Sequence, residues 1–413
     1  MKVLMINSVC GVGSTGKICT DIADMLIERG HECRIAYGRN NVPSRYKNIV
    51  YRIGSDFGVN INGVKTRLFD NEGGNAKGAT KKLIRFIKEY DPDVIHLHNL
   101  HGYYLNVGLL FDYLKTCDKK VVWTLHDCWA FTGHCPYFTI ARCDKWETGC
   151  YKCPNRKEYP KSFFDNSKKM WKLKKEWFTG VKDMTIITPS HWLAELVKQS
   201  FLKDYPVQVI NNGIDLSVFK PSESDFRKKF GIEDKKIVLG VANVWEHRKG
   251  LDVFVELAKR LDNRKYQIVL IGTDDKVDKL LPNGIISIHR TQNQTELAEI
   301  YSTADVFVNP TREENYPTVN MEAIACGTPV ITFRTGGSPE ILIEKTGMVV
   351  DSDDIDAMQK DIEDICKKNL FSEEELLIRA KTFDKKANFG EYIDLYKQIT
   401  DNNNDCERDK KCN

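Results

Sequence analysis

The chain has 413 residues, of which 41% are hydrophobic and 29% are charged. This balance suits a globular protein of two or three domains and excludes a disordered or fibrous one. A formal net charge of +3 is too small to indicate nucleic-acid binding by itself.

The chain begins directly on an apolar run, with no charged leader before a long apolar segment and no later stretch of about 18 apolar residues. Thirteen cysteines are scattered along it, which fits reduced thiols better than a small disulfide scaffold. We therefore expect a cytoplasmic protein, with any membrane contact peripheral at the inner face.

The first half of the chain alternates strands with amphipathic helices. The predicted strands are 2–6, 33–37, 93–98, 120–126, 184–190 and 207–210, and the predicted helices are 18–29 and 81–89. This alternation predicts an α/β domain with a doubly wound parallel sheet.

A glycine-rich loop, Gly11-Val-Gly-Ser-Thr-Gly-Lys17, follows the first strand. It fits the first seven positions of a P-loop, but the eighth, which should be Ser or Thr to hold Mg²⁺, is Ile18. A P-loop-like kinase or NTPase is one reading. In the other, a flexible turn lets the backbone, including Gly13, come close to a ligand.

Histidines gather at the carboxyl ends of two predicted strands. His98 and His101 end strand 93–98, and His126 with Asp127 ends strand 120–126. A histidine beside an aspartate can orient a hydroxyl or carry a proton, since its unperturbed pKa is about 6.5. The pair Asp91 and Asp93 has the spacing of a metal-binding Asp-x-Asp, but it precedes its strand. We therefore expect a turn there and no catalytic metal ion.

A cysteine-rich insert spans about residues 134–155, with thiols at Cys135, Cys143, Cys150 and Cys153. Four thiolates satisfy Zn²⁺ in a closed structural geometry, so structural zinc, plain thiols and a disulfide pair all remain open. A zinc-dependent nucleic-acid-binding protein is an alternative class. The strand–helix pattern around the insert favours an enzyme instead.

Residues 161–182 form a predicted helix in which aromatic residues alternate with lysines. Such a helix can lie on an anionic membrane surface, or it can pack its apolar stripe on the core and expose its lysines. Both readings stay open.

The second half repeats the pattern, with predicted strands at 236–242, 266–272, 285–288, 305–308 and 330–332 and helices at 250–261 and 296–301. We place the domain boundary at 210–211, so that a first domain, 1–210, precedes a second, 211–387. The polar segment 401–413 is predicted to be a disordered tail.

The loop and helix after strand 305–308 carry Glu314 and Glu322, which are separated by seven residues. In an open parallel sheet this loop faces the ligand crevice, so the carboxylates would accept hydrogen bonds from ligand hydroxyls. Free backbone N–H groups at the helix start, around Tyr316, Thr318 and Val319, would suit a phosphate.

This spacing, continued by 326–331 and 335–340, resembles the Glu-x7-Glu motif of retaining family-four glycosyltransferases. The match to the family's Asn-Gly-x-Asp junction at 212–221 and its Thr-x-His at His126 strengthens the resemblance. It implies the GT-B fold, which has two Rossmann-like domains facing a cleft and a C-terminal helix, here about 388–400, that returns to the first domain.

The resemblance also implies roles for individual residues. Glu314 would contact the donor sugar, Glu322 the nucleotide ribose, and His126 would lie beside the sugar. Lys249 matches the family lysine that neutralises the diphosphate, whereas Asn243 stands where the family carries an arginine, which leaves Arg248 as the substitute. Pro317 replaces a family glycine and removes one N–H. Further donor contacts are expected from Gly13, Arg290, Asn315, Tyr316, Thr318 and Val319, and acceptor contacts from His98, His101 and Asp127.

The implied function is hexosyl transfer with retention from a nucleotide-diphosphate sugar to a carbohydrate or lipid-linked acceptor, without nucleic acid as a partner. The cysteine-rich insert with Trp123-Thr-Leu-His-Asp127 resembles the branch that builds capsular polysaccharides and exopolysaccharides of the colanic-acid type.

Overall fold

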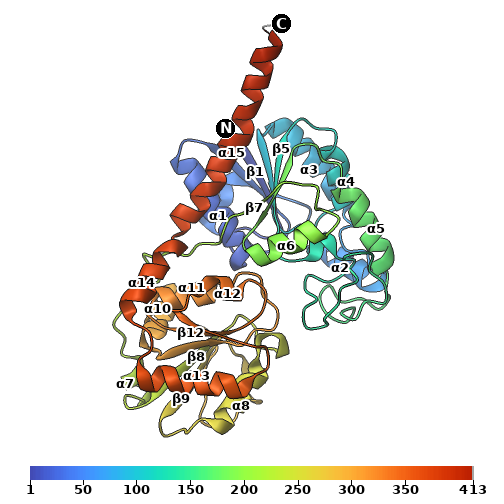
Figure 1. Cartoon of the computed structure of the whole chain (residues 1–413). Coiled ribbons are helices and arrows are strands. Elements are labelled where there is room, and N and C mark those ends of the chain that lie inside the picture. Colours follow the sequence, from blue (N-terminus) through green and yellow to red (C-terminus); the bar gives the residue numbers. More distant parts are fainter. Residues whose placement is uncertain (412–413) are drawn as a thin grey trace. The chain divides into compact units, whose positions relative to one another are not determined.

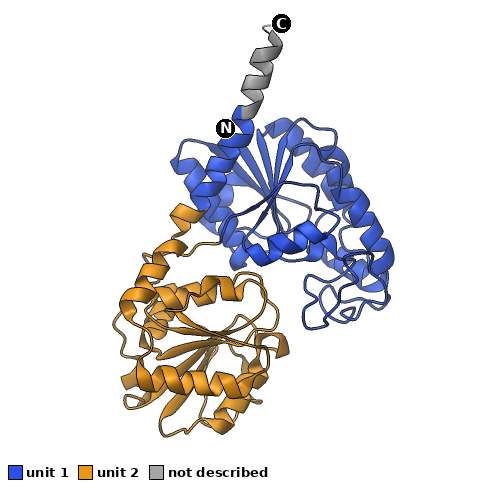
Figure 2. Ribbon diagram, in the orientation of Figure 1, with its two compact units in different colours: residues 1–211, 389–413 blue, residues 212–388 orange. Residues whose placement is uncertain are grey.

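The computed structural model describes the backbone of residues 1–411 and the side chains of residues 1–401. Two compact units make up the chain: unit 1 holds residues 1–211 and 389–413, and unit 2 holds residues 212–388 (Figure 2). Both divisions fall one residue later than the predicted boundaries. The predicted tail, 401–413, lies almost entirely outside the residues whose side chains are described.

Unit 1 is built on a seven-stranded sheet in the order β3-β2-β1-β4-β5-β6-β7, and every strand pair in it is parallel. The strands are β1 (Lys2–Asn7), β2 (Glu32–Tyr37), β3 (Val50–Arg52), β4 (Val94–Leu97), β5 (Lys120–Thr124), β6 (Met184–Thr188) and β7 (Val207–Val209). The helices are α1 (Gly13–Glu28), α2 (Asp56–Phe69), α3 (Lys77–Tyr90), α4 (Val107–Leu114), α5 (Ser167–Phe178) and α6 (His191–Gln199), with 3-10 turns at Ser44–Ile49 and Trp129–Phe131.

Both faces of this sheet are covered, which is why its strands are continuously apolar. In β1, Leu4 and Ile6 pack into one core cluster, and Val3 and Met5 pack into the cluster on the opposite face. The last helix, α15 (Lys385–Lys411), runs alongside α1 of unit 1 (Figure 1). It adds Tyr392 and other aromatic residues to the second cluster. Residues far apart in the chain thus share one core.

Unit 2 contains a six-stranded parallel sheet in the order β10-β9-β8-β11-β12-β13. The strands are β8 (Lys236–Val241), β9 (Tyr266–Ile271), β10 (Ile286–Ile288), β11 (Val306–Asn309), β12 (Val330–Phe333) and β13 (Gly347–Val350). The helices are α7 (Phe226–Phe230), α8 (Leu251–Arg260), α9 (Asp275–Asp278), α10 (Gln294–Thr303), α11 (Thr318–Ala325), α12 (Ser338–Ile341), α13 (Ile355–Lys368) and α14 (Glu373–Ala380), with 3-10 turns at His247–Lys249 and Lys381–Phe383.

The strand order reverses direction at β1/β4 in unit 1 and at β8/β11 in unit 2. In a doubly wound sheet, ligands bind beyond the carboxyl ends of the strands at this switch point. The prediction of two doubly wound parallel-sheet domains is confirmed, and the topology directs attention to one edge of each sheet.

Candidate functional site

In unit 2, the loop between β11 and α11 carries the first candidate carboxylate. Glu314 accepts a hydrogen bond from Lys249 Nζ at 2.5 Å on one oxygen and from the Asn315 N–H at 3.1 Å on the other. Burial alone would raise the pKa of Glu314, but the charge and hydrogen bond of Lys249 lower it on balance. The carboxylate is therefore ionised at neutral pH and held in one orientation.

A glycine on the next turn fixes the same loop. Gly336 has a φ of +53°, and a Cβ atom there would lie 1.7 Å from the carbonyl oxygen of Glu314. The Gly337 N–H donates to the Asn315 carbonyl at 2.8 Å. The segment predicted from 335–340 thus packs directly on the backbone of the Glu314 loop.

Two arginines form hydrogen bonds and ion pairs with the residues around this loop. Arg312 is 8% exposed and donates to both carboxylate oxygens of Asp252, at 2.9 and 2.7 Å, and to Asp353 at 2.8 Å. Arg248 Nη1 donates to the Glu313 carbonyl at 3.1 Å, and the Arg248 carbonyl accepts from the Arg312 N–H at 2.8 Å. The Arg248–Lys249 turn and the Glu314 loop are therefore one rigid assembly.

The helix α11 supplies the second carboxylate. Its N-cap is Pro317, and no side chain caps the helix start. Thr318, Val319 and Glu322 are half-exposed on it, and Glu322 accepts from the Tyr301 hydroxyl at 3.3 Å. Tyr316, by contrast, is only 6% exposed and packs in the core of unit 2. A ligand there would meet its backbone, and the ring serves packing.

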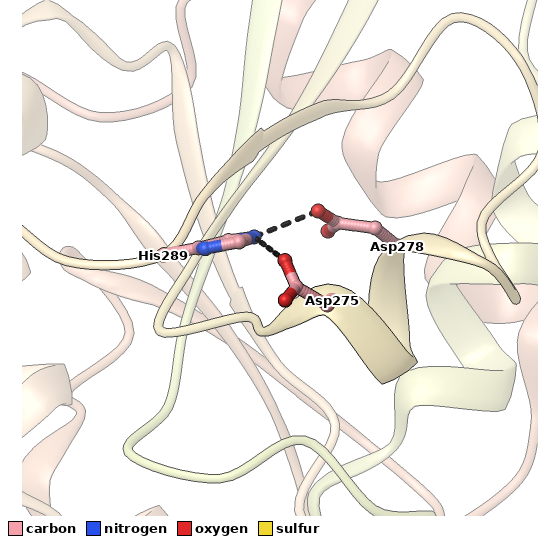
Figure 3. A group of neighbouring side chains, drawn as sticks. All are labelled: Asp275, Asp278 and His289. Atoms are coloured by element: carbon pink, nitrogen blue, oxygen red, sulfur yellow. Dashed lines mark hydrogen bonds and ion pairs between the residues drawn. The ribbon is translucent and has the colours of Figure 1, made fainter.

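The remaining predicted donor residues lie at neighbouring strand ends. Asn243 follows β8 and Arg290 follows β10, and both are exposed. Between these ends lies an acidic cluster in which His289 pairs with Asp278 at 2.7 Å and with Asp275 at 3.9 Å (Figure 3). All three side chains are exposed, and their mutual ion pairs account for the grouping, so we assign no metal to them.

In unit 1, the histidines of β4 and β5 come together at the switch-point edge. His98 Nδ1 lies 3.1 Å from His126 Nε2, with the two rings stacked. Burial lowers the pKa of His126 to about 4 and that of His98 well below its ordinary value. Both imidazoles are therefore neutral at physiological pH, and they suit hydrogen bonding to uncharged hydroxyls.

A second pair completes this edge. His101 Nε2 lies 2.9 Å from Asp127 Oδ2, and His101 Nδ1 lies 3.0 Å from the Tyr159 hydroxyl. Burial alone would raise the pKa of Asp127, but His101 lowers it on balance. Tyr159 is not among the predicted site residues, because nothing in the sequence relates it to a histidine 58 residues earlier.

Behind the site, His96 bonds Thr124 at 2.8 Å and the Tyr396 hydroxyl at 2.6 Å. Tyr396 comes from α15, so the returning helix supports the histidine edge from the core side. All of these side chains are buried. His96 is thus a structural histidine and not a ligand-facing one.

The glycine-rich segment does not form a P-loop. α1 begins at Gly13, and Ser14 to Lys17 lie in its first turns, so the open loop that a P-loop wraps around a phosphate is absent between Gly13 and Lys17. The P-loop kinase or NTPase reading is therefore wrong. Gly13 itself has a φ of +65° with open space around its Cα, which keeps the backbone accessible at the start of the helix.

The predicted basic helix is shorter than 161–182 and covers Ser167–Phe178. Its apolar residues Met170, Trp171 and Phe178 are buried in unit 1, whereas Phe163 and Phe164, which precede it, are exposed. The core-packing reading is therefore correct for the helix itself. Within residues 1–401, no helix is long and apolar enough to cross a membrane.

The four cysteines of the insert line one pocket together with His134, and no described cysteine is disulfide-bonded. A hydrogen bond between Cys135 and Cys153 raises the pKa of Cys135 and lowers that of Cys153 to about 7. The structure describes all four as free thiols.

Two parallel doubly wound sheets, each with polar residues at its switch point, define the architecture of GT-B glycosyltransferases. The sucrose-phosphate synthase of Thermosynechococcus elongatus superimposes with a TM-score of 0.71 at 18% identity, over 96% of this chain and 98% of that one. HepE of Anabaena, solved in complex with UDP, superimposes with a TM-score of 0.68 at 15% identity, over 96% of this chain and all of that one.

Family models account for most of the chain. The model described as Glycosyltransferase Family 4 matches residues 15–218, and that described as Glycosyl transferases group 1 matches residues 222–387. The Escherichia coli protein WcaC, named as a colanic acid biosynthesis glycosyl transferase, is 24% identical over 86% of this chain and 88% of its own length. The chain belongs to the family-four glycosyltransferases.

Proposed function

We propose that this glycosyltransferase moves a hexosyl unit from a nucleotide-diphosphate sugar to a carbohydrate or lipid-linked acceptor, with retention of anomeric configuration, in surface polysaccharide biosynthesis. The observation that carries the proposal is the Lys249–Glu314 pair at the switch-point edge of unit 2. It offers a cation to a diphosphate and an oriented carboxylate to a sugar hydroxyl.

The donor half of the proposal rests on unit 2. Lys249 and Arg248 bring positive charge to the turn after β8, where charge would develop on the phosphate oxygens of the leaving group. The half-exposed start of α11 adds free backbone N–H groups and a helix N-terminus. Glu322 would accept hydrogen bonds from ribose hydroxyls. The UDP complex of HepE supports a nucleotide-diphosphate donor by analogy.

The state of Glu314 supports a role in orienting the sugar and argues against a role as nucleophile or base. Each of its oxygens already accepts a hydrogen bond, and its lowered pKa makes it a weak base and a poor nucleophile. We therefore propose that it orients the sugar, and that the donor's own phosphate takes the acceptor proton. The prediction that no catalytic metal ion is needed stays part of the proposal.

The acceptor half rests on unit 1. His98, His126, His101 and Asp127 form a polar edge whose two central imidazoles are neutral, which suits uncharged sugar hydroxyls. We propose that His126 positions the reacting sugar and that His101 with Asp127 binds the acceptor. Exposed Phe163 and Phe164 beside several lysines fit a lipid-linked acceptor at the inner face of a membrane.

A thermal-shift panel of UDP-, GDP- and ADP-sugars without added metal tests the donor assignment. One nucleotide series should stabilise the wild type and should fail to stabilise Glu322→Ala. Glu374→Ala, which removes an exposed carboxylate on α14, is the matched control and should respond like the wild type. Absence of any response to sugar nucleotides would refute the proposal. Proton NMR of the product's anomeric coupling then tests retention.

A further inference from the structure

The cysteine-rich insert is a long segment without regular structure. Between the 3-10 turn Trp129–Phe131 and α5, the structure has neither helix nor strand. Segments of this length inside a compact domain need some other source of order. Part of it comes from aromatic packing, in which Trp146 stacks on Phe138 and contacts Phe131 at a tilt, and its carbonyl accepts from Trp171.

The second source of order is the pocket around which the insert folds. Cys135, Cys143, Cys150 and Cys153 all line it, although they are spread along the chain. Cys150 and Cys153 flank a tight turn in which Lys152 has a φ of +44°. Cysteines two residues apart around such a turn are the usual half-site of a structural zinc centre.

The groups around the sulfur atoms are suited to thiolates. The Gly133 N–H donates to Cys150 Sγ at 3.2 Å, and a Cβ atom on Gly133 would lie 2.7 Å from the Cys150 Cβ. Lys174 is 1% exposed, donates to the Trp129 carbonyl at 2.7 Å and lies 3.6 Å from the centroid of the Trp129 ring. A metal-bound thiolate carries charge, so the Gly133 N–H would bond it more strongly than it bonds a neutral thiol.

A buried histidine gives an independent indication of an ion. His134 lines the same pocket, its side chain is fully buried, and its Nδ1 lies 2.5 Å from Asp70 Oδ1. Its Nε2 is buried with no hydrogen-bond partner. A histidine that ligates a metal ion usually donates its other ring N–H to a carboxylate, so His134 marks this pocket as suited to an ion.

We propose that Cys135, Cys143, Cys150 and Cys153 bind one zinc ion as thiolates, with the Gly133 N–H and His134 as the supporting groups around it. Among the described residues, no three of these sulfur atoms lie within 4.8 Å of one another, so zinc binding would draw the sulfur atoms closer together. With four protein ligands the site is closed, and the ion performs no chemistry.

The ion would hold the insert against the candidate acceptor edge. Asp70, which pairs with His134, ends α2 and also accepts from the Asn166 N–H at 2.8 Å just before α5. Lys174 bonds the backbone of Trp129, which lies two residues after Asp127. Tyr159, beyond the insert, reaches His101. Zinc would thus order the segment that carries Tyr159 without touching substrate.

Metal analysis of the purified full chain tests the proposal. The wild type, expressed with zinc supplied, should carry about one zinc ion per chain. Cys143→Ser and Cys150→Ser should carry much less. Cys117→Ser is the matched control, because Cys117 is a half-buried thiol after α4, outside the insert, and it should keep the wild-type content. Wild-type protein with no bound zinc, or a Cys143→Ser variant with full zinc, would overturn the assignment.

Zinc X-ray absorption on the wild type needs no variant and so remains decisive if the serine variants do not fold. Four sulfur neighbours at about 2.3 Å are expected. Three sulfurs and one nitrogen would overturn the four-thiolate set and make His134 a ligand. As a second readout, a chelator should lower the melting temperature and open the segment 132–166 to proteolysis; unchanged cleavage after zinc removal would overturn the structural role.

Discussion

Replacing Lys249 tests the charge arrangement on which the donor assignment depends. In the free protein Lys249 and Glu314 are mostly buried, at 21% and 19% side-chain exposure, and are joined by a 2.5 Å hydrogen bond. A hydrogen bond to a charged group contributes about 1.5–3 kcal/mol, or about 10- to 150-fold in Kd. We therefore expect Lys249→Ala to weaken binding of a nucleotide-diphosphate sugar by this factor.

Calorimetric titration with a series of ligands locates the loss. The nucleotide-diphosphate sugar and the free nucleoside diphosphate should both bind Lys249→Ala more weakly, whereas the nucleoside should bind it as it binds the wild type. Glu314→Gln should lose affinity only for the ligand that carries the sugar. Lys259→Ala is the matched control, since Lys259 is 62% exposed on α8 and pairs only with Glu256 among the ion pairs described.

Two outcomes would refute this reasoning. Unchanged affinity of Lys249→Ala for the diphosphate ligands would mean that the lysine does not meet phosphate. An equal loss for the nucleoside and the diphosphate would mean that the substitution disturbs the edge as a whole, for instance by leaving the Glu314 carboxylate without its cation.

Other predictions follow from single residues. His126→Ala should lower kcat by about 10²- to 10³-fold, the loss expected when one positioned hydrogen-bonding group is removed. Steady-state kinetics should show no such loss in the control, His191→Ala, whose side chain is exposed. Burial lowers the pKa of His126 to about 4, so between pH 6.5 and 4 the unfolded chain binds a proton that the folded chain does not. Denaturation measured across this range should show the free energy of unfolding falling by about 3 kcal/mol as the pH is lowered. His126→Asn should reduce this pH dependence. Gly336→Ala should abolish donor binding in the thermal-shift assay, since the new Cβ would clash with the Glu314 carbonyl. Gly231→Ala is the control, because Gly231 has a similar φ of +61° but no atom near the position of a Cβ, and this variant should still bind the donor. The same loss of binding in both variants would contradict the steric argument.

The sequence predicted most of the fold because strand–helix alternation in a parallel sheet leaves a clear periodic signal. It missed β3 and β13, which are short edge strands. It also missed α2, on which Phe57 and Val64 are 75% and 59% exposed, so that its apolar residues do not mark the buried face. The start of α1 was misplaced because Val12 provides no side-chain cap and glycines suggest a loop.

The residues of the candidate site likewise fall into those that the sequence could predict and those that it could not. Residues at strand ends, such as His126, could be named because topology fixes where parallel strands end. Contacts between side chains could not be predicted in this way, because Lys249 and Glu314 are 65 residues apart and no local sequence pattern relates them. The same holds for Tyr159, whose partner His101 is set by the path of an irregular insert.

The electrostatics of the two edges explain why one topology can serve two kinds of ligand. In unit 2 the switch point carries Lys249 and Arg248 beside an ionised Glu314, a mixed field that suits a ligand with both phosphate and hydroxyl groups. In unit 1 burial keeps His98 and His126 neutral, so that this part of the edge offers hydrogen bonds without charge. A dianionic diphosphate would gain little binding free energy from these neutral imidazoles, and an uncharged sugar would gain little from the charge of Lys249. The proposed assignment of the donor to unit 2 and the acceptor to unit 1 is therefore supported by the charges of the two strand-end edges. These charges differ between the two units although the units share one fold.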